Sequence, residues 1–233
     1  MQRLLGIAED QWSLITRRQA QTAGVGNTSL ARLVEDGRLE RVAHGVYRVR
    51  GAGQPGHLGL RAAWLQLQPE TPVWARLGDP DVAVVSHASA ASLYGVGDLR
   101  ADVHEFTLPL RRQSRRRDVR LHRGSVPAGD AIVLRGLPVT RAGRMIGDLL
   151  ADHVEPNAVG QIAAEVIDGV LDYPSEIAEQ IAPHAASFGL PRGDGVALLD
   201  RLLALAGHKS SAAAMIASGS CAPRRDRLRT LSR

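Results

Sequence analysis

The hydrophobic pattern of the first fifty residues predicts three short helices. The first would bury three apolar residues, Trp12, Leu14 and Ile15. Thr16 predicts the N-cap of a second helix over residues 17–23, and Gly24 predicts its end. Asn27 predicts the cap of the third helix. Its apolar residues recur at the spacing of one buried helical face, Leu30, Leu33 and Val34.

A β-hairpin is expected directly after these helices. Residues 39–43 and 46–50 are two runs of alternating character that flank a turn at His44 and Gly45. Three helices followed by a β-hairpin is the order of elements in a winged helix-turn-helix domain. The segment therefore predicts either a DNA-binding domain or the same fold used only for protein contacts.

A winged helix-turn-helix predicts which residues would contact DNA. Its third helix enters the major groove, with its N-terminal side chains nearest the base edges. Thr28, Ser29 and Arg32 are then the candidates for reading bases, whereas nearby arginines would contact phosphates. The full set of predicted DNA contacts is Arg17, Arg18, Asn27, Thr28, Ser29, Arg32, Arg41 and Arg48.

The remaining chain predicts an α+β protein, with a winged helix-turn-helix at residues 1–50 and a second domain after it. Residues 51–56 are rich in glycine and read as a linker. Residues 57–207 predict a mixed α/β domain that ends in a block of helices. The Ser-, Ala- and Arg-rich segment 208–233 predicts a disordered basic tail.

A Ser86–His87 pair and scattered histidines are the only hints of site chemistry. Ser86 is expected to cap a helix over residues 87–94, and adjacent side chains normally diverge, so a hydrolase is disfavoured. No His-x-x-x-His spacing, phosphate-binding glycine loop or nuclease-type lysine site occurs. The sequence thus predicts no catalytic residues, no metal site and no cofactor.

The densest run of positive charge spans residues 111–117, in the hairpin loop expected between two strands. It predicts a second patch that binds phosphates or an acidic partner, or else an exposed loop. The residues of this second basic patch are Arg111, Arg112, Arg115, Arg116, Arg117, Arg120 and Arg123.

Charge is divided unevenly along the 233 residues. Residues 1–50 carry a net +3 and residues 51–150 a net +4, which favours a polyanionic partner, whereas residues 151–207 carry a net −7. The acidic helices could dock a basic partner, allow self-association or only solvate a bundle. A single cysteine excludes an intrachain disulfide, and no apolar run suggests a membrane span or signal peptide, so a cytoplasmic protein is expected.

Several motifs, in order, resemble the AbiEi-type antitoxins of bacterial type IV toxin–antitoxin systems. Besides the N-terminal segment they are the stretches 45–49, 86–95 and 136–141, and the resemblance covers about residues 9–150. It implies a repressor that binds repeats in its own promoter. It also implies a nucleotidyltransferase-like toxin encoded nearby, and it supports Arg17, Arg18, Thr28, Ser29, Arg32 and Arg48 as DNA contacts.

The hypothesis from sequence is a non-enzymatic autorepressor and antitoxin that binds double-stranded promoter DNA, with self-association on the DNA left open. Two alternatives belong to other classes. One is an interaction module that neutralises its toxin by direct contact, and the other is an enzyme that modifies the toxin covalently.

Overall fold

The computed structural model describes residues 2–79 and 81–217. It divides into two compact units, Met1–Ala83 and Val84–Arg233, each with its own β-sheet. The fold is mixed α/β and ends in helices, as the sequence predicts. Within the described ranges, no helix combines the length and apolar character needed to cross a membrane.

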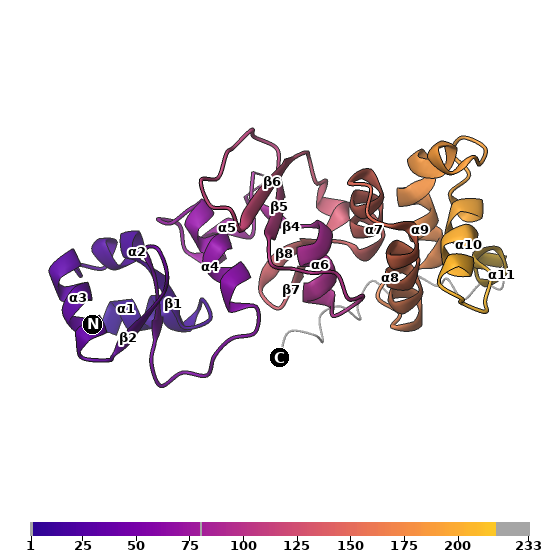
Figure 1. The fold of residues 1–233 in the computed structure, drawn as a ribbon. Helices are drawn as coiled ribbons and strands as arrows, with labels where there is room; N and C mark the ends of the chain where they lie inside the picture. Colours follow the sequence, from indigo (N-terminus) through magenta and orange to yellow (C-terminus); the bar gives the residue numbers. More distant parts are fainter. Residues whose placement is uncertain (1, 80, 218–233) are drawn as a thin grey trace. The chain divides into compact units, whose positions relative to one another are not determined.

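Three helices of the first unit precede its hairpin (Figure 1): α1 (Gln2–Glu9), α2 (Arg17–Thr22) and α3 (Asn27–Glu35). The prediction of a first helix around Trp12 was wrong. Trp12 and Ser13 both have φ of 60°, in the left-handed region, which cannot continue an α-helix. The fully buried residues that follow instead form strand β1 (Leu14–Thr16).

Thr16 is the N-cap of helix α2, as the sequence predicts, and it forms a complete capping box with Gln19. Its hydroxyl oxygen accepts a hydrogen bond from the Gln19 backbone amide at 3.1 Å, while the Gln19 side chain accepts from the Thr16 amide at 3.0 Å. The Thr16 hydroxyl also donates to the Pro69 carbonyl. One buried side chain therefore fixes both the start of α2 and the later segment around Pro69.

Replacing Thr16 with alanine is expected to destabilise the first unit by about 1–2 kcal/mol, because the helix loses its cap and a buried carbonyl loses its donor. Thr16→Ser keeps the hydroxyl and should retain most of the stability. All three tryptophans of the chain lie in this unit, so tryptophan fluorescence during urea denaturation reports on it alone. Equal midpoints for wild type and Thr16→Ala would contradict the assigned role.

Strand β1 joins the predicted hairpin, β2 (Leu39–Ala43) and β3 (Val46–Val49), in a three-stranded antiparallel sheet of order β1-β3-β2. A register shift between Arg41 and Ala43 bends β2 next to the turn. One apolar core is shared by the three helices and the sheet; its buried residues are Leu4, Ala8, Ile15, Ala20, Leu30, Leu33 and Leu39.

Two further helices, α4 (Leu58–Leu67) and α5 (Val73–Arg76), belong to the first unit. Helix α4 packs on all three strands of the sheet. Its buried Trp64 donates from Nε1 to the Ala83 carbonyl at 2.7 Å, which ties the end of the unit to α4. The division of the chain therefore lies after Ala83, later than the linker expected at 51–56.

The second unit contains a five-stranded mixed sheet of order β6-β5-β4-β8-β7. Its strands are β4 (Val84–Val85), β5 (His104–Leu108), β6 (Val119–Arg123), β7 (Ala131–Leu134) and β8 (Leu137–Thr140), with the short 3-10 helix η1 (Ala128–Asp130) before β7. Strands β5 and β6 are parallel, with His104 opposite Val119. The segment between them is thus a crossover, and the prediction of a hairpin loop was wrong.

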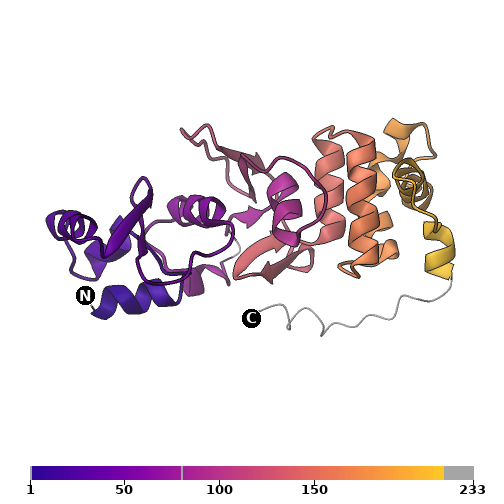
Figure 2. The same cartoon turned by 60° about the horizontal axis from the view of Figure 1, so that its bottom comes forward.

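Helices make up the rest of the second unit: α6 (His87–Tyr94), α7 (Ala142–Ala151), α8 (Pro156–Asp168), α9 (Pro174–Ile181), η2 (Ala182–Phe188), α10 (Gly195–Leu205) and α11 (Ala212–Ala217). Helix α6 packs on β5 and on α7, and Figure 2 shows α7 and α8 side by side. Helix α11 falls in the segment predicted to be a disordered tail, so that prediction was wrong for residues 212–217. Residues 218–233 lie outside the described part of the chain.

Candidate functional site

Helix α3 has one apolar and one polar face. Leu30 and Leu33 are buried in the core of the first unit. At 100° per residue, Thr28 and Arg32 lie on the opposite side of the helix, and both side chains are exposed. Ser29 is also exposed, at the edge of the polar face. Because the opposite face of α3 is buried, the predicted base-reading residues are exposed to solvent on the same side of the helix.

The N-terminal end of α3 is the end suited to a polyanion. Gly26 is its N-cap and provides no side-chain hydrogen bond, so first-turn amides remain available for a phosphate. The prediction that Asn27 caps the helix was wrong, since Asn27 is its first residue and accepts a hydrogen bond from Gln21 Nε2 at 3.1 Å. Glu35 ends the helix and would repel phosphates. The N-terminal half must therefore face any DNA.

Arginines lie exposed at the start of α2 and beside the hairpin turn. The Arg17 amide donates to the Gly45 carbonyl at 2.8 Å, so the start of α2 is adjacent to the turn. Exposed Arg41 lies 3.2 Å from His44 Nδ1 through its Nη2 atom. Arg18 is also exposed and forms only a long, solvent-facing ion pair of 3.8 Å with Glu70. These three guanidinium groups meet the exposure that phosphate contacts require.

Arg48 differs from the other predicted contacts because its charge is already paired. Its Nη2 and Nε atoms donate to Glu40 Oε2 at 2.7 and 3.2 Å, and only 15% of its side chain is exposed. The hydrogen bond from Arg48, together with its charge, holds the pKa of Glu40 below the ordinary value. Arg48 is therefore less available to a phosphate than Arg17, Arg18 and Arg41, although the sequence places all four among the predicted contacts.

This difference predicts distinct behaviour for two arginine variants. Arg17→Ala should weaken binding to any DNA duplex and reduce the slope of log affinity against log salt by about 1, because a phosphate contact and its released counterion are lost. Arg48→Ala should leave the slope unchanged. Fluorescence anisotropy at several salt concentrations measures both slopes, and equal slopes for the two variants would contradict the distinction.

The second basic patch lies on the crossover between β5 and β6 and on β6 itself. Two of its arginines are paired within the unit: Arg116 contacts Asp118, and Arg120 donates to both carboxylate oxygens of Asp152 at 2.7 and 2.8 Å. The others are exposed, namely Arg111, Arg112, Arg115, Arg117 and Arg123. The patch is therefore less basic than the run of arginines suggests.

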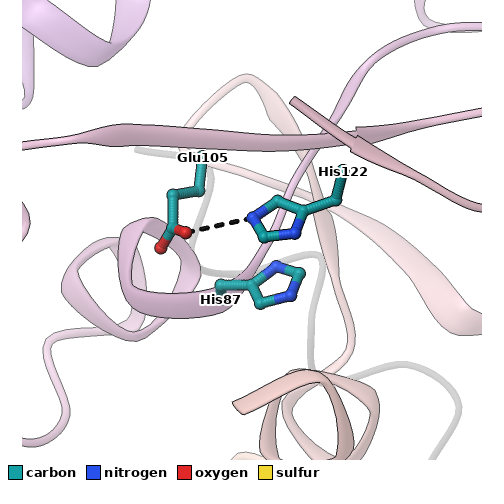
Figure 3. A group of neighbouring side chains, drawn as sticks. All are labelled: His87, Glu105 and His122. Carbon is teal, nitrogen blue, oxygen red and sulfur yellow. Dashed lines mark hydrogen bonds and ion pairs between the residues drawn. The ribbon is translucent and has the colours of Figure 1, made fainter. Parts of the chain in front are cut away.

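A separate group of polar side chains, the histidine cluster, comprises His87, Glu105 and His122 (Figure 3). The side chains come from the start of α6 and from the neighbouring strands β5 and β6. Glu105 Oε1 lies 3.0 Å from His122 Nε2, and the two imidazole rings stack with centroids 3.5 Å apart. The sequence did not predict this cluster, because its members lie far apart along the chain and only parallel β5–β6 pairing brings them together.

Ser86 does not use its side chain to cap α6, although it occupies the N-cap position. Its hydroxyl oxygen lies 2.9 Å from His87 Nδ1 and accepts from Thr107 at 2.8 Å, so the expectation that the adjacent side chains diverge was wrong. Ser86 is fully buried and cannot meet a substrate as a nucleophile. The α6 amide of Ala88 is instead capped by Glu105 Oε2 at 3.0 Å.

Burial is the main reason that the pKa of His87 lies below its ordinary value, and the charge of His122 lowers it further. The carboxylates of Asp148, Glu105 and Asp152 act in the opposite direction. Burial and the neighbouring His122 outweigh these three acids, so the surroundings of His87 favour the neutral imidazole.

Comparison with known proteins identifies the N-terminal segment. Residues 2–50 match the family model described as a transcriptional regulator, AbiEi antitoxin, which confirms the resemblance over this segment. Among solved structures, the chain is similar to the RV2827C protein from Mycobacterium tuberculosis, with a TM-score of 0.51 and 16% sequence identity. The likeness covers 92% of this chain and 79% of that chain, and it shows a shared fold alone. Among curated proteins, none matches this chain in sequence.

Proposed function

We propose that this protein represses its own operon by inserting α3 into the major groove of promoter DNA, since residues 2–50 match the family model of AbiEi antitoxin transcriptional regulators. The exposed polar face of α3 carries the proposal. Thr28 and Arg32 share that face, while Leu30 and Leu33 hold the other face in the core. A rigid, exposed helix of this kind can read base edges.

The arginines around α3 support the same orientation. Arg17 and Arg41 flank the hairpin turn and would contact phosphates on either side of the groove. Phosphate contacts position a protein without reading sequence, so discrimination would rest on Thr28, Ser29 and Arg32. The proposed regulator therefore combines general attraction to DNA with a small base-reading surface.

We further propose that the protein acts as the antitoxin of a nucleotidyltransferase-like toxin encoded beside it, and that paired copies occupy promoter repeats. The match of residues 2–50 to the AbiEi antitoxin family model supports the antitoxin role, and the exposed part of the second basic patch supplies a surface for an acidic partner. The regulatory role needs no catalytic residue. Co-expression with the adjacent gene tests the toxin proposal by rescue of growth, and undiminished toxicity would reject it.

Gel-shift titration of the full chain tests whether the protein binds promoter DNA, which is the first step of the proposed repression. The DNA upstream of the gene should bind at least about 1000-fold more tightly than a scrambled duplex of equal length at physiological salt. A reporter driven by the same DNA should be silenced when the protein is expressed. Equal affinity for the two duplexes, together with an unaffected reporter, would reject the proposed function.

A further inference from the structure

We propose that His87, Glu105 and His122 bind one divalent transition-metal ion of the zinc class in the second unit. Two imidazoles and one carboxylate are a common ligand set for such an ion and leave a further position for water. The sequence predicts no metal site, since no paired-histidine spacing occurs. The inference rests on the folded arrangement and is independent of DNA binding.

The spacing of the donor atoms is close to that of a coordinated ion. One ligand atom from each residue can be chosen such that all three lie within 4.8 Å of one another. In a tetrahedral site, ligand atoms that are each 2.0–2.2 Å from the ion lie about 3.3–3.6 Å apart. Binding therefore requires the ligand atoms to draw closer. The stacked rings must turn out of their parallel arrangement until their lone pairs converge on the ion, which then replaces the proton between His122 and Glu105.

The backbone conformation at His87 directs its side chain. His87 has φ of 53°, in the left-handed region that residues other than glycine rarely adopt, and six other non-glycine residues of the described chain share a positive φ. At His87 this conformation turns the imidazole towards β5 and β6 at the very start of α6 (Figure 3).

Neighbouring groups form hydrogen bonds to the proposed ligands. In known metal sites, such outer-shell hydrogen bonds orient the ligating side chains. Ser86 and Thr107 form a buried hydroxyl chain to the His87 ring, and the Ala88 amide donates to Glu105 Oε2. Glu105 is itself buried, with 9% of its side chain exposed. These contacts hold the His87 ring and the Glu105 carboxylate next to each other before any ion arrives, whereas the rings turn when the ion binds.

Apart from Glu105, the charged groups near the cluster are paired with one another. Arg120 lies 3.7 Å from Glu105 Oε1, and its Nη1 and Nη2 atoms donate to Asp152, which offsets its charge. Asp148 acts on His87 as well; its Oδ1 atom accepts from Arg144 at 2.8 Å, whereas its Oδ2 atom is buried with no hydrogen-bond partner among the described residues. The carboxylate of Glu105 therefore supplies the negative charge that an ion at the cluster would meet.

Calorimetric titration of untagged, metal-stripped full-length protein with Zn²⁺ tests the site. We expect one equivalent to bind, and we expect both His122→Ala and Glu105→Gln to weaken binding at least about 100-fold, since even outer-shell changes cost 10–100-fold. His184→Ala removes a partly buried histidine of the same unit outside the cluster and should bind as the wild type does. Circular dichroism checks that each variant is folded.

X-ray absorption of the zinc-loaded wild type provides a readout that does not depend on variants. The proposal predicts two imidazoles and light oxygen ligands around the ion. A sulfur ligand would identify the single cysteine as the binder and overturn the proposal. No binding by the wild type, or full binding by both cluster variants, would show that the cluster is only a hydrogen-bonded His–Glu pair.

Discussion

Replacing Arg32 with alanine is expected to weaken binding to the promoter by about 1–3 kcal/mol and to relax its sequence preference. Arg32 is exposed on the polar face of α3, one helical turn after Thr28, where a guanidinium can donate two hydrogen bonds to a guanine edge. Its loss should therefore reduce the difference between promoter and scrambled DNA, rather than lower both affinities equally. Competition gel shifts with both duplexes measure that difference.

Arg192→Ala is the matched control for Arg32→Ala. Arg192 is exposed in the second unit, so this variant removes the same charge at a residue that is not a predicted DNA contact. It should leave both affinities within twofold of the wild type. If Arg32→Ala loses no more discrimination than Arg192→Ala, Arg32 does not read a base.

Replacing Gly195 with alanine is expected to destabilise the second unit by about 3 kcal/mol or more. A Cβ atom at this position would lie 1.8 Å from the Ala178 carbonyl oxygen and 2.7 Å from its carbon. Both are backbone atoms of α9, so no side-chain rotation relieves the overlap, and α10 must separate from α9. Hydrogen exchange followed by mass spectrometry should show lost protection in both helices.

The same variant should leave the first unit folded. Tryptophan fluorescence reports only on that unit, and its denaturation midpoint should not change. Gly129→Ala is the control, because a Cβ there meets no atom within 4 Å. If the backbone amides of α9 and α10 exchange no faster in Gly195→Ala than in Gly129→Ala, α10 does not depend on close packing against α9 at this position.

The local pattern of the sequence predicts elements whose residues are near neighbours along the chain. The capping box at Thr16, the buried face of α3 and the hairpin of β2 and β3 all depend on contacts between residues a few positions apart. The prediction of the first helix was wrong because tertiary contacts determine the secondary structure of this segment. Leu14 and Ile15 are apolar, but they pair with β3 and form a strand. Alternating or clustered apolar residues in so short a segment do not distinguish the two outcomes.

The features of the sites that the sequence could not predict depend on pairing between strands. Exposure of Thr28, Ser29 and Arg32 follows from helical periodicity alone. The pairing of Arg48 with Glu40 depends on the register of β2 and β3, which places these residues opposite each other. The histidine cluster depends on a parallel β5–β6 pair, whereas two strands joined by a short basic segment suggest an antiparallel hairpin.

Directed DNA cleavage from α3 tests most directly whether this helix enters the groove. Ala31 is exposed beside the polar face and is not itself a predicted contact, so an iron chelate on Ala31→Cys, in a Cys221→Ser background, places the reagent there. The account predicts cuts within the bound promoter site, and none by the same variant without the chelate. Promoter DNA that is bound with normal affinity but left uncut from position 31 would contradict it.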